Sequence, residues 1–155
     1  MVGASVRDEL SQVVLGGVAV VVATVGSDGR PVITRGWGLR YDAESSTLTL
    51  TVTAPSGSPT LANLESNGAI AVTVSEPATY RTVQVKGVVE HVGAPSEQER
   101  TWAHEHRDRF VEEVAKLGIT SGADRLFLGD LRLVSFRIGE FFDQTPGPDA
   151  GRRLE

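Results

Sequence analysis

Two turn signals divide residues 18–53 into three β-rich segments, and this pattern constrains the fold more than any other feature of the chain. The segments are VAVVVATV, PVITRGWGLRY and TLTLTVT, and they are separated by residues 27–30 and 42–46. The first separator contains Asp28 and Gly29. Asp-Gly between two hydrophobic runs favours a tight hairpin, because a primed turn needs positive φ values and has the twist of its flanking strands. The sequence therefore predicts an antiparallel meander.

A loop of small residues follows the meander at 53–60 (TAPSGSPT) and leads into LANLESN. Ser58 suits the N-cap of a short helix, and Pro59 suits its first position. The first amides of a helix have no partner within the helix, and the helix dipole favours negative charge there. A phosphate-bearing ligand held at this loop, with Ser56, Ser58 and Thr60 around it, is therefore the first functional hypothesis.

Three further strands and one long helix complete the predicted core. The strands are expected at AIAVTVS, at RTVQVKGVVEHV and at LRLVSFRI, the last with room to continue through residues 140–143. Alternation in the second of these places Thr82, Gln84 and Lys86 on one face. The spacing of Ser96 and Glu99 is that of a capping box, so a helix should run from there to about residue 116. Its buried side is expected to hold Trp102, Phe110, Val114 and Leu117.

The segments around this core have weaker patterns. The apolar run 13–25 is too short to span a bilayer and follows Asp8 and Glu9 instead of basic residues, so it is expected to be a core strand. Residues 119–129 predict a loop with a short helical turn. The ending QTPGPDAGRRLE is too rich in Pro and Gly for regular structure. One domain over residues 1–142, followed by a tail at 143–155, is expected.

Composition excludes several classes of protein. With 155 residues, 40% of them hydrophobic and 23% charged, the chain suits one globular domain. A net charge of −5 and the lack of a Lys/Arg cluster argue against nucleic-acid binding. The absence of Cys excludes disulfides, thiolate catalysis and zinc–thiolate sites. A soluble, cytoplasmic protein without a membrane segment is expected.

Six strands joined mostly by hairpins predict a mainly β fold, a closed or nearly closed antiparallel barrel. The segments follow one another in this order: the ATV-x-x-DGRP strand, the next two strands, the Ser-rich loop with LANLESN, the fourth strand and YRTVQVKGVVEHV. This order resembles that of the pyridoxamine 5'-phosphate oxidase-like family over residues 18–92. The resemblance implies a six-stranded antiparallel split β-barrel of Greek-key type, with one long covering helix and one short helix. It also implies FMN or the deazaflavin F420 as cofactor, and a homodimer with two flavin sites at its interface.

The resemblance implies contacts for the flavin phosphate. In the oxidases, a basic residue on the second strand and a Ser-Arg-Lys run grip the phosphate, and Arg35 can fill the first role. The corresponding run here is Ser58-Pro59-Thr60, which keeps the hydroxyls and lacks both cations. Each charge-assisted contact contributes about 1.5 to 3 kcal/mol, so other cations would have to replace them. The available substitutes are Arg35, Arg40, Arg81 and Lys86.

The resemblance also implies contacts for the flavin ring. Gln84 is displaced by two residues from the Gln of the oxidase pattern but stays on the same strand face, where it could hydrogen-bond the pyrimidine edge. Thr82 and Lys86 share that face. Gly36 and Gly38 flank Trp37 and leave room for a ring to approach the backbone, although Trp37 also suits a core or a dimer interface.

The sequence favours no catalytic or metal-binding residues of its own. His104 and His106 are two residues apart on a helix and point in different directions, and His91 stands alone, so no metal site is expected. The chain has no G-x-S-x-G motif and no Ser with an identifiable His and acid. Any redox chemistry would therefore belong to a cofactor.

Two functions stay open at this point. The first is an FMN-dependent oxidoreductase acting on a small-molecule substrate, with F420 as the alternative cofactor. The second is a non-catalytic binding or sensing protein for a flavin, F420 or haem. Synthesis of pyridoxal phosphate is not expected, because the C-terminus has no match to the substrate-binding residues of the oxidases. Residues 141–148 predict either a segment that docks over a ligand site or a frayed strand end.

Overall fold

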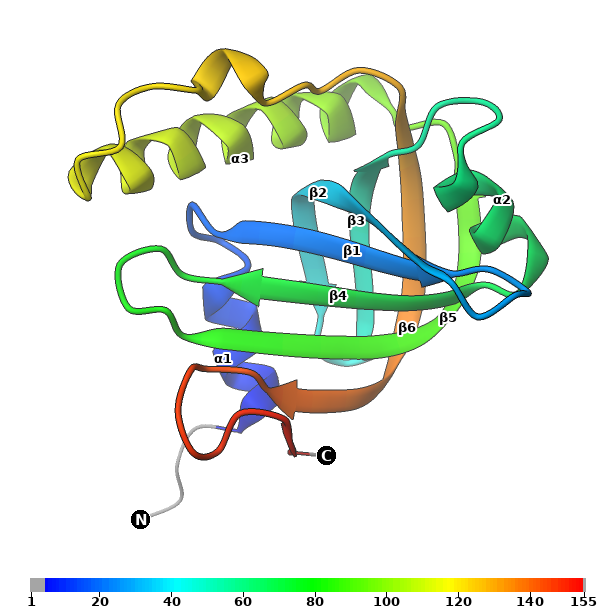
Figure 1. The fold of residues 1–155 in the computed structure, drawn as a ribbon, viewed down its shortest axis with the longest axis horizontal. Helices are drawn as coiled ribbons and strands as arrows, with labels where there is room; N and C mark the ends of the chain where they lie inside the picture. The colour runs from blue at the N-terminus through cyan, green and yellow to red at the C-terminus, as the bar shows by residue number, and fades with distance from the viewer. Residues whose placement is uncertain (1–4, 155) are drawn as a thin grey trace.

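The computed structural model describes residues 5–154 as a closed antiparallel barrel with helices around it (Figure 1). The strands are β1 (Ala19–Val25), β2 (Pro31–Asp42), β3 (Thr47–Thr53), β4 (Ala69–Ser75), β5 (Thr82–Gly93), β6 (Leu131–Asp143) and β7 (Arg152–Arg153). They pair in the order β3-β2-β1-β4-β5-β6-β7, and a further pairing of β3 with β6 closes the barrel. The order β3-β2-β1-β4 is that of a Greek key. The predicted six-stranded antiparallel barrel is confirmed.

Both turn signals of the meander form turns. In the first, Gly29 has φ of 81°, and the Asp28 carboxylate accepts a hydrogen bond of 3.0 Å from the Arg30 amide. In the second, Ser46 has φ of 56°, and Asp42 accepts a hydrogen bond from the Ser45 hydroxyl at 2.7 Å. These short polar side chains bond to their own turns, which is why the chain reverses at these points.

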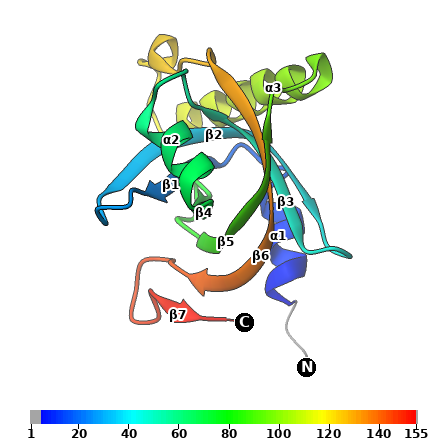
Figure 2. The ribbon, with the colours of Figure 1, turned by 90° about the vertical axis from the view of Figure 1, so that its right-hand side faces the viewer.

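Two short helices pack against the barrel at its ends (Figure 2). Helix α1 (Val6–Val13) has a Ser5–Asp8 capping box and buries Val6, Leu10 and Val13 in the barrel core. Helix α2 (Pro59–Ser66) has Ser58 as its N-cap and Pro59 in its first turn, as predicted. The expected core strand over 13–25 is wrong in its first part, because α1 ends at Val13 and β1 begins only at Ala19.

Helix α3 (Glu97–Lys116) covers the outside of the barrel and contacts β2 most extensively. Ser96 caps it by accepting the Glu99 amide at 3.1 Å. The prediction of its buried side is partly wrong: the fully buried residues are Ala103 and His106, whereas Leu117 is 48% exposed. The chain then returns along α3 through the short 3₁₀ helix η1 (Ala123–Arg125). Within the described residues, no helix is long and apolar enough to cross a membrane.

The C-terminal tail is more ordered than its composition predicts. Arg152 and Arg153 form β7 and pair with Asp143 and Phe142 of β6. The Leu154 amide donates to the Phe141 carbonyl at 2.8 Å, and the Leu154 side chain packs against the core. The expectation of no regular structure there is wrong, because Gly147 (φ 148°) and Gly151 (φ 89°) let the chain turn back onto β6.

Candidate functional site

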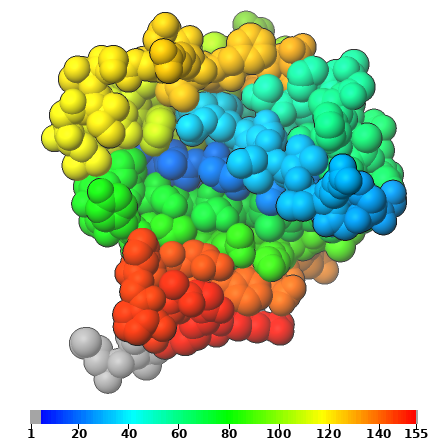
Figure 3. Space-filling model, in the orientation of Figure 1, coloured from blue at the N-terminus to red at the C-terminus, as the bar shows by residue number. Residues whose placement is uncertain are grey.

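The outer face of β2, β1, β4, β5 and β6 carries side chains in transverse rows set by the strand register. One row is Arg35, Val21, Thr73, Gln84 and Phe142. The next row along the strands is Ile33, Ala23, Ala71, Lys86 and Glu140. We call this surface the open face. It is apolar for a surface, because Ile33 is 70% exposed, Val88 62% and Val21 38%. Figure 3 shows this side of the molecule, with the blue segment of β1 above the green segments of β4 and β5.

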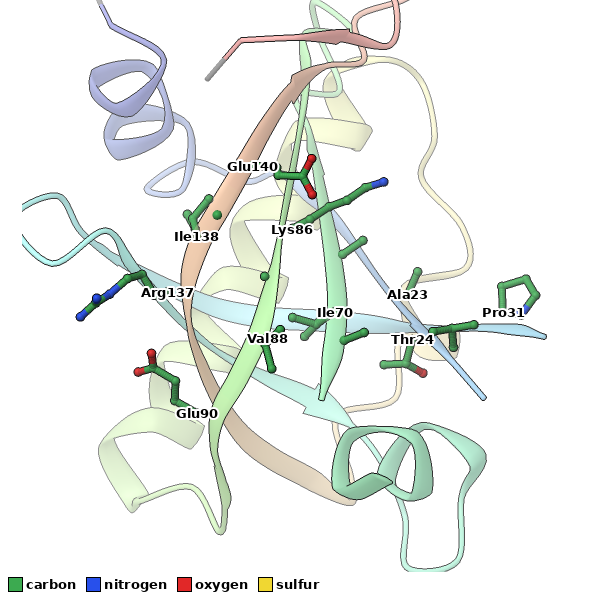
Figure 4. A pocket seen from close by; sticks show the side chains of 15 residues that line it. Ala23, Thr24, Pro31, Ile70, Lys86, Val88, Glu90, Arg137, Ile138 and Glu140 are labelled. Carbon is green, nitrogen blue, oxygen red and sulfur yellow. The ribbon is translucent and has the colours of Figure 1, made fainter. Parts of the chain in front are cut away.

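A hollow of about 720 Å³ lies on the open face, across β1, β4, β5 and β6 (Figure 4). Small residues line its middle, namely Ala23, Ala69, Ala71, Gly87 and Gly139. Lys86, Glu90, Arg137 and Glu140 supply charge around it. A concave apolar surface with a few polar groups at its border is typical of small-molecule sites.

The predicted residues of β5 lie on this face. Lys86 is exposed and borders the hollow, with its ammonium 4.9 Å from the centre of the Phe142 ring. The Gln84 amide donates to the Thr73 hydroxyl at 3.1 Å. Thr82 is buried, and its hydroxyl lies 2.9 Å from that of Ser75. The polar side of β5 is therefore partly occupied by contacts within the protein.

The loop between β3 and α2 has a cation beside it that sequence patterns did not reveal. Arg132 of β6 donates from Nη2 to the Ser56 hydroxyl at 3.0 Å and from Nε to the Ala54 carbonyl at 3.3 Å. It is held there because Val52 of β3 pairs with Arg132. Ser58 accepts the Leu61 amide at 3.3 Å as N-cap, and Thr60 is buried. Arg132 lies in the segment LRLVSFRI, which carries no motif, so only the β3–β6 pairing places it here.

The predicted basic substitutes do not converge on this loop. Arg35 is exposed and lies 5.9 Å from the Phe110 ring of α3. Arg40 stacks on Trp102 of α3 at 3.6 Å, and burial lowers the pKa of its guanidinium, with nearby Arg109 adding to the effect. Arg81 forms an ion pair with Glu9 of α1. Each is positioned by a helix outside the barrel.

Gly36 and Trp37 are positioned by packing. A Cβ at Gly36 would lie 2.8 Å from Leu50 Cδ1. The direction in which a side chain would project from Gly36 therefore points into the barrel core. Trp37 is only 2% exposed and lies between the barrel and α3, with its ring centre 5.4 Å from that of His106. Within the described residues, the indole N–H of Trp37 has no hydrogen-bond partner.

His106 joins α3 to the barrel. Its Nδ1 accepts the Gly38 amide at 2.9 Å, and its Nε2 lies 2.9 Å from the Val18 carbonyl. These partners require a neutral ring that donates from Nε2. Burial lowers the pKa of His106 to about 4, and the nearby charges of Arg109 and Arg40 act in the same direction. His106 therefore has a structural role. Among residues 5–154, no group of three His, Asp or Glu side chains is arranged to hold a metal ion.

Comparison with known proteins agrees with this architecture. Similar solved structures include a conserved hypothetical protein of Mycobacterium tuberculosis (TM-score 0.59, 18% identity, covering 91% of this chain and 84% of that one). An F420 reductase gives a TM-score of 0.55 at 22% identity, covering 84% and 94% of the two chains. An FMN-binding protein related to pyridoxamine 5'-phosphate oxidase, from Nostoc punctiforme, gives 0.52 at 12% identity, covering 95% and 87%. At these identities the likeness shows the fold alone.

A search of curated protein sequences found no match. The sequence profile of the pyridoxamine 5'-phosphate oxidase family matches residues 6–138, which is most of the chain and extends from α1 into β6. The chain therefore belongs to the pyridoxamine 5'-phosphate oxidase family.

Proposed function

We propose that this protein binds FMN and acts as a flavin-dependent oxidoreductase on a small organic substrate. The observation that carries the proposal is the contact between Arg132 and Ser56, beside the capped start of α2. The loop lacks the two cations of the oxidase pattern, and Arg132 supplies a guanidinium from another strand. Within residues 5–154, two of its five N–H donors have partners, so the others can contact a phosphate.

The open face fits the remainder of a flavin. The alanines and glycines of the hollow leave room for a planar ring system, and Gln84 and Lys86 offer polar groups at its border. Arg35, in the same row as Gln84, is exposed and available to an anionic group. When bound, a flavin supplies hydride transfer. The residues of this chain bind and orient it, because the face carries no Ser–His–acid set or other nucleophilic constellation among the described residues.

A second copy of the chain is the proposed cover of the open face. Ile33, Val21 and Val88 are exposed together on it, and contiguous exposed apolar residues of this kind mark interaction surfaces. A homodimer would bury these side chains and exclude water from the hollow. The hydride-transfer site would then lie at the interface between the two copies.

F420 is the alternative cofactor, and one observation favours it. Arg100 of α3 and Arg132 together line a cleft of about 350 Å³ at the start of β6. Because Arg132 also contacts Ser56, the cleft adjoins the proposed phosphate loop. A ligand with a second anionic group beyond its phosphate would therefore find a second guanidinium there.

The test is a parallel titration of the apo protein with FMN and F420, followed by ligand fluorescence. We expect dissociation constants of micromolar or lower for one of them. Arg132→Gln should weaken binding at least tenfold, or about 1.4 kcal/mol, because the guanidinium at the loop is lost. Arg35→Ala tests the second basic contact in the same way, and Arg100→Gln should weaken F420 while leaving FMN unchanged.

Arg125→Gln is the matched control, because Arg125 lies in η1, which is apart from the loop before α2 in Figure 1. Absence of binding to both cofactors would contradict the proposal and favour a non-catalytic barrel with another ligand, such as haem. If the wild type and Arg132→Gln bind the cofactor with equal affinity, the loop does not bind the phosphate.

A further inference from the structure

The chain that leaves α3 folds back along the helix and encloses a pocket between the two (Figure 1). We call residues 117–128 the return segment. Gly118 (φ 86°) and Gly122 (φ 93°) allow the chain to turn, and η1 follows directly. The Ile119 amide donates to the Val114 carbonyl at 3.1 Å and ties the return segment to the end of the helix. The pocket is therefore a built part of the fold.

The pocket has a volume of about 320 Å³ and a mainly apolar lining. Helix α3 contributes Phe110 and Val114 to it, and the return segment contributes Ile119 and Leu126. Phe110 and Val114 belong to the apolar stripe that was expected to be buried, yet both are only partly buried. The volume is at the lower end of the range for small-molecule sites. The pocket therefore suits a compact apolar group such as one ring.

A cation lies at one side of this pocket. The Arg35 guanidinium is 5.9 Å from the centre of the Phe110 ring, which is itself held by an edge contact with Trp37. Arg35 is exposed, and among residues 5–154 it forms no ion pair. The Glu113 carboxylate, one turn further along α3, pairs with Lys116 instead, at 2.6 Å. A ligand that fills the pocket can therefore place an anionic group at Arg35.

We propose that the pocket between α3 and the return segment binds a small carboxylic acid that carries one apolar ring. The ring packs against Phe110 and the return segment, since aromatic rings pack favourably edge to face or offset. The carboxylate contacts the Arg35 guanidinium. This pocket and the hollow of the open face share no lining residue. The site therefore goes beyond the proposed flavin function and does not need a bound flavin.

The test is an NMR titration of the isotope-labelled full chain, without flavin, using phenylpropionate and its neutral amide. The amide signals of Ile119 and Gly122 should shift with both ligands, and the acid should bind more tightly. Arg35→Gln should weaken binding of the acid about threefold, the modest effect of an exposed ion pair, and should leave the neutral amide unchanged. Arg30→Gln, an exposed arginine just before β2, is the matched control.

A second set of variants tests the pocket itself. Val114→Trp fills it and should abolish the shifts with both ligands while FMN affinity stays unchanged. Ala115→Leu adds a smaller group at an exposed lining position and should weaken both ligands, which covers the case that Val114→Trp does not fold. Leu15→Trp adds the same indole at an exposed position outside the pocket and should leave binding intact.

Three results would overturn the proposal. The first is unchanged binding in both Val114→Trp and Ala115→Leu. The second is a set of shifts confined to residues of the hollow, such as Ala71 and Gly87. The third is absence of binding by both ligands, and if Val114→Trp then also dissociates a wild-type dimer, the pocket is part of a subunit interface. Because no flavin is present, none of these results bears on flavin binding, which stands or fails on its own titration.

Discussion

The barrel has two contrasting outer faces, one sealed by α3 and one left open. On the sealed face, Trp37 and His106 are almost fully buried, and the helix approaches closely at Gly17 and Gly38. On the open face, apolar side chains such as Ile33 and Val88 remain exposed around a hollow. The same strand β2 contributes to both. Since both faces carry apolar side chains, apolar character alone does not decide which face of this barrel receives its own helix.

The closest approach of α3 to β2 depends on Gly38, so its substitution should have the largest effect on folding. Gly38 has φ of 65°, and a Cβ there would lie 3.0 Å from the Ala103 amide nitrogen. Backbone strain and overpacking together predict that Gly38→Ala lowers the free energy of unfolding by about 2–4 kcal/mol. Urea denaturation measures this change.

Gly29→Ala is the matched control, because Gly29 also has positive φ but has no atom within 4 Å of its Cβ position. It should cost only the strain, about 1–2 kcal/mol. Equal losses in the two variants would show that α3 does not depend on close approach at Gly38.

The His106 link should make the sealed face sensitive to acid. Its pKa is lowered to about 4 in the folded protein, from a value of 6.5. Protonation of His106 therefore destabilises the folded state. The stabilisation that neutral His106 contributes is complete above pH 6.5 and is lost as the pH falls towards 4. Each pKa unit corresponds to about 1.4 kcal/mol, so the total loss should be about 3 kcal/mol.

Urea denaturation between pH 7 and pH 4 tests this prediction. His106→Gln should flatten the pH dependence, because it removes the titrating ring, whereas His104→Gln on the exposed side of α3 should not. An unchanged pH profile in His106→Gln would assign the acid sensitivity to other groups.

Charge on the open face should have the smallest effect on folding and a clear effect on assembly. Ile33→Lys and Val88→Lys replace exposed side chains, so the free energy of unfolding of one subunit should change by about 0.5 kcal/mol or less. If the open face is the dimer interface, both variants should be monomeric in analytical ultracentrifugation under conditions where the wild type is a dimer. Leu117→Lys, at the exposed C-cap of α3, is the control. A wild-type protein that is monomeric would contradict the proposed interface.

Sequence patterns predicted the barrel because its signals are local. The Asp28-Gly29 turn, the Ser58 and Ser96 caps and the strand alternation all act over a few residues. The site depended on long-range pairing, because Arg132 reaches Ser56 only through the pairing of β6 with β3. The burial of His106 could not be predicted from the sequence, because nothing nearby in sequence reveals its partners Val18 and Gly38.

The β3–β6 pairing has a consequence for how the protein is made. The strand that closes the barrel is the last of its long strands to leave the ribosome, so β3 keeps an unpaired edge while residues 54–130 are synthesised. Contacts between segments this distant in sequence form slowly, and an open strand edge is prone to wrong partners. Closure of this barrel therefore waits for the synthesis of β6, and truncations within β6 should yield aggregation instead of a smaller folded domain.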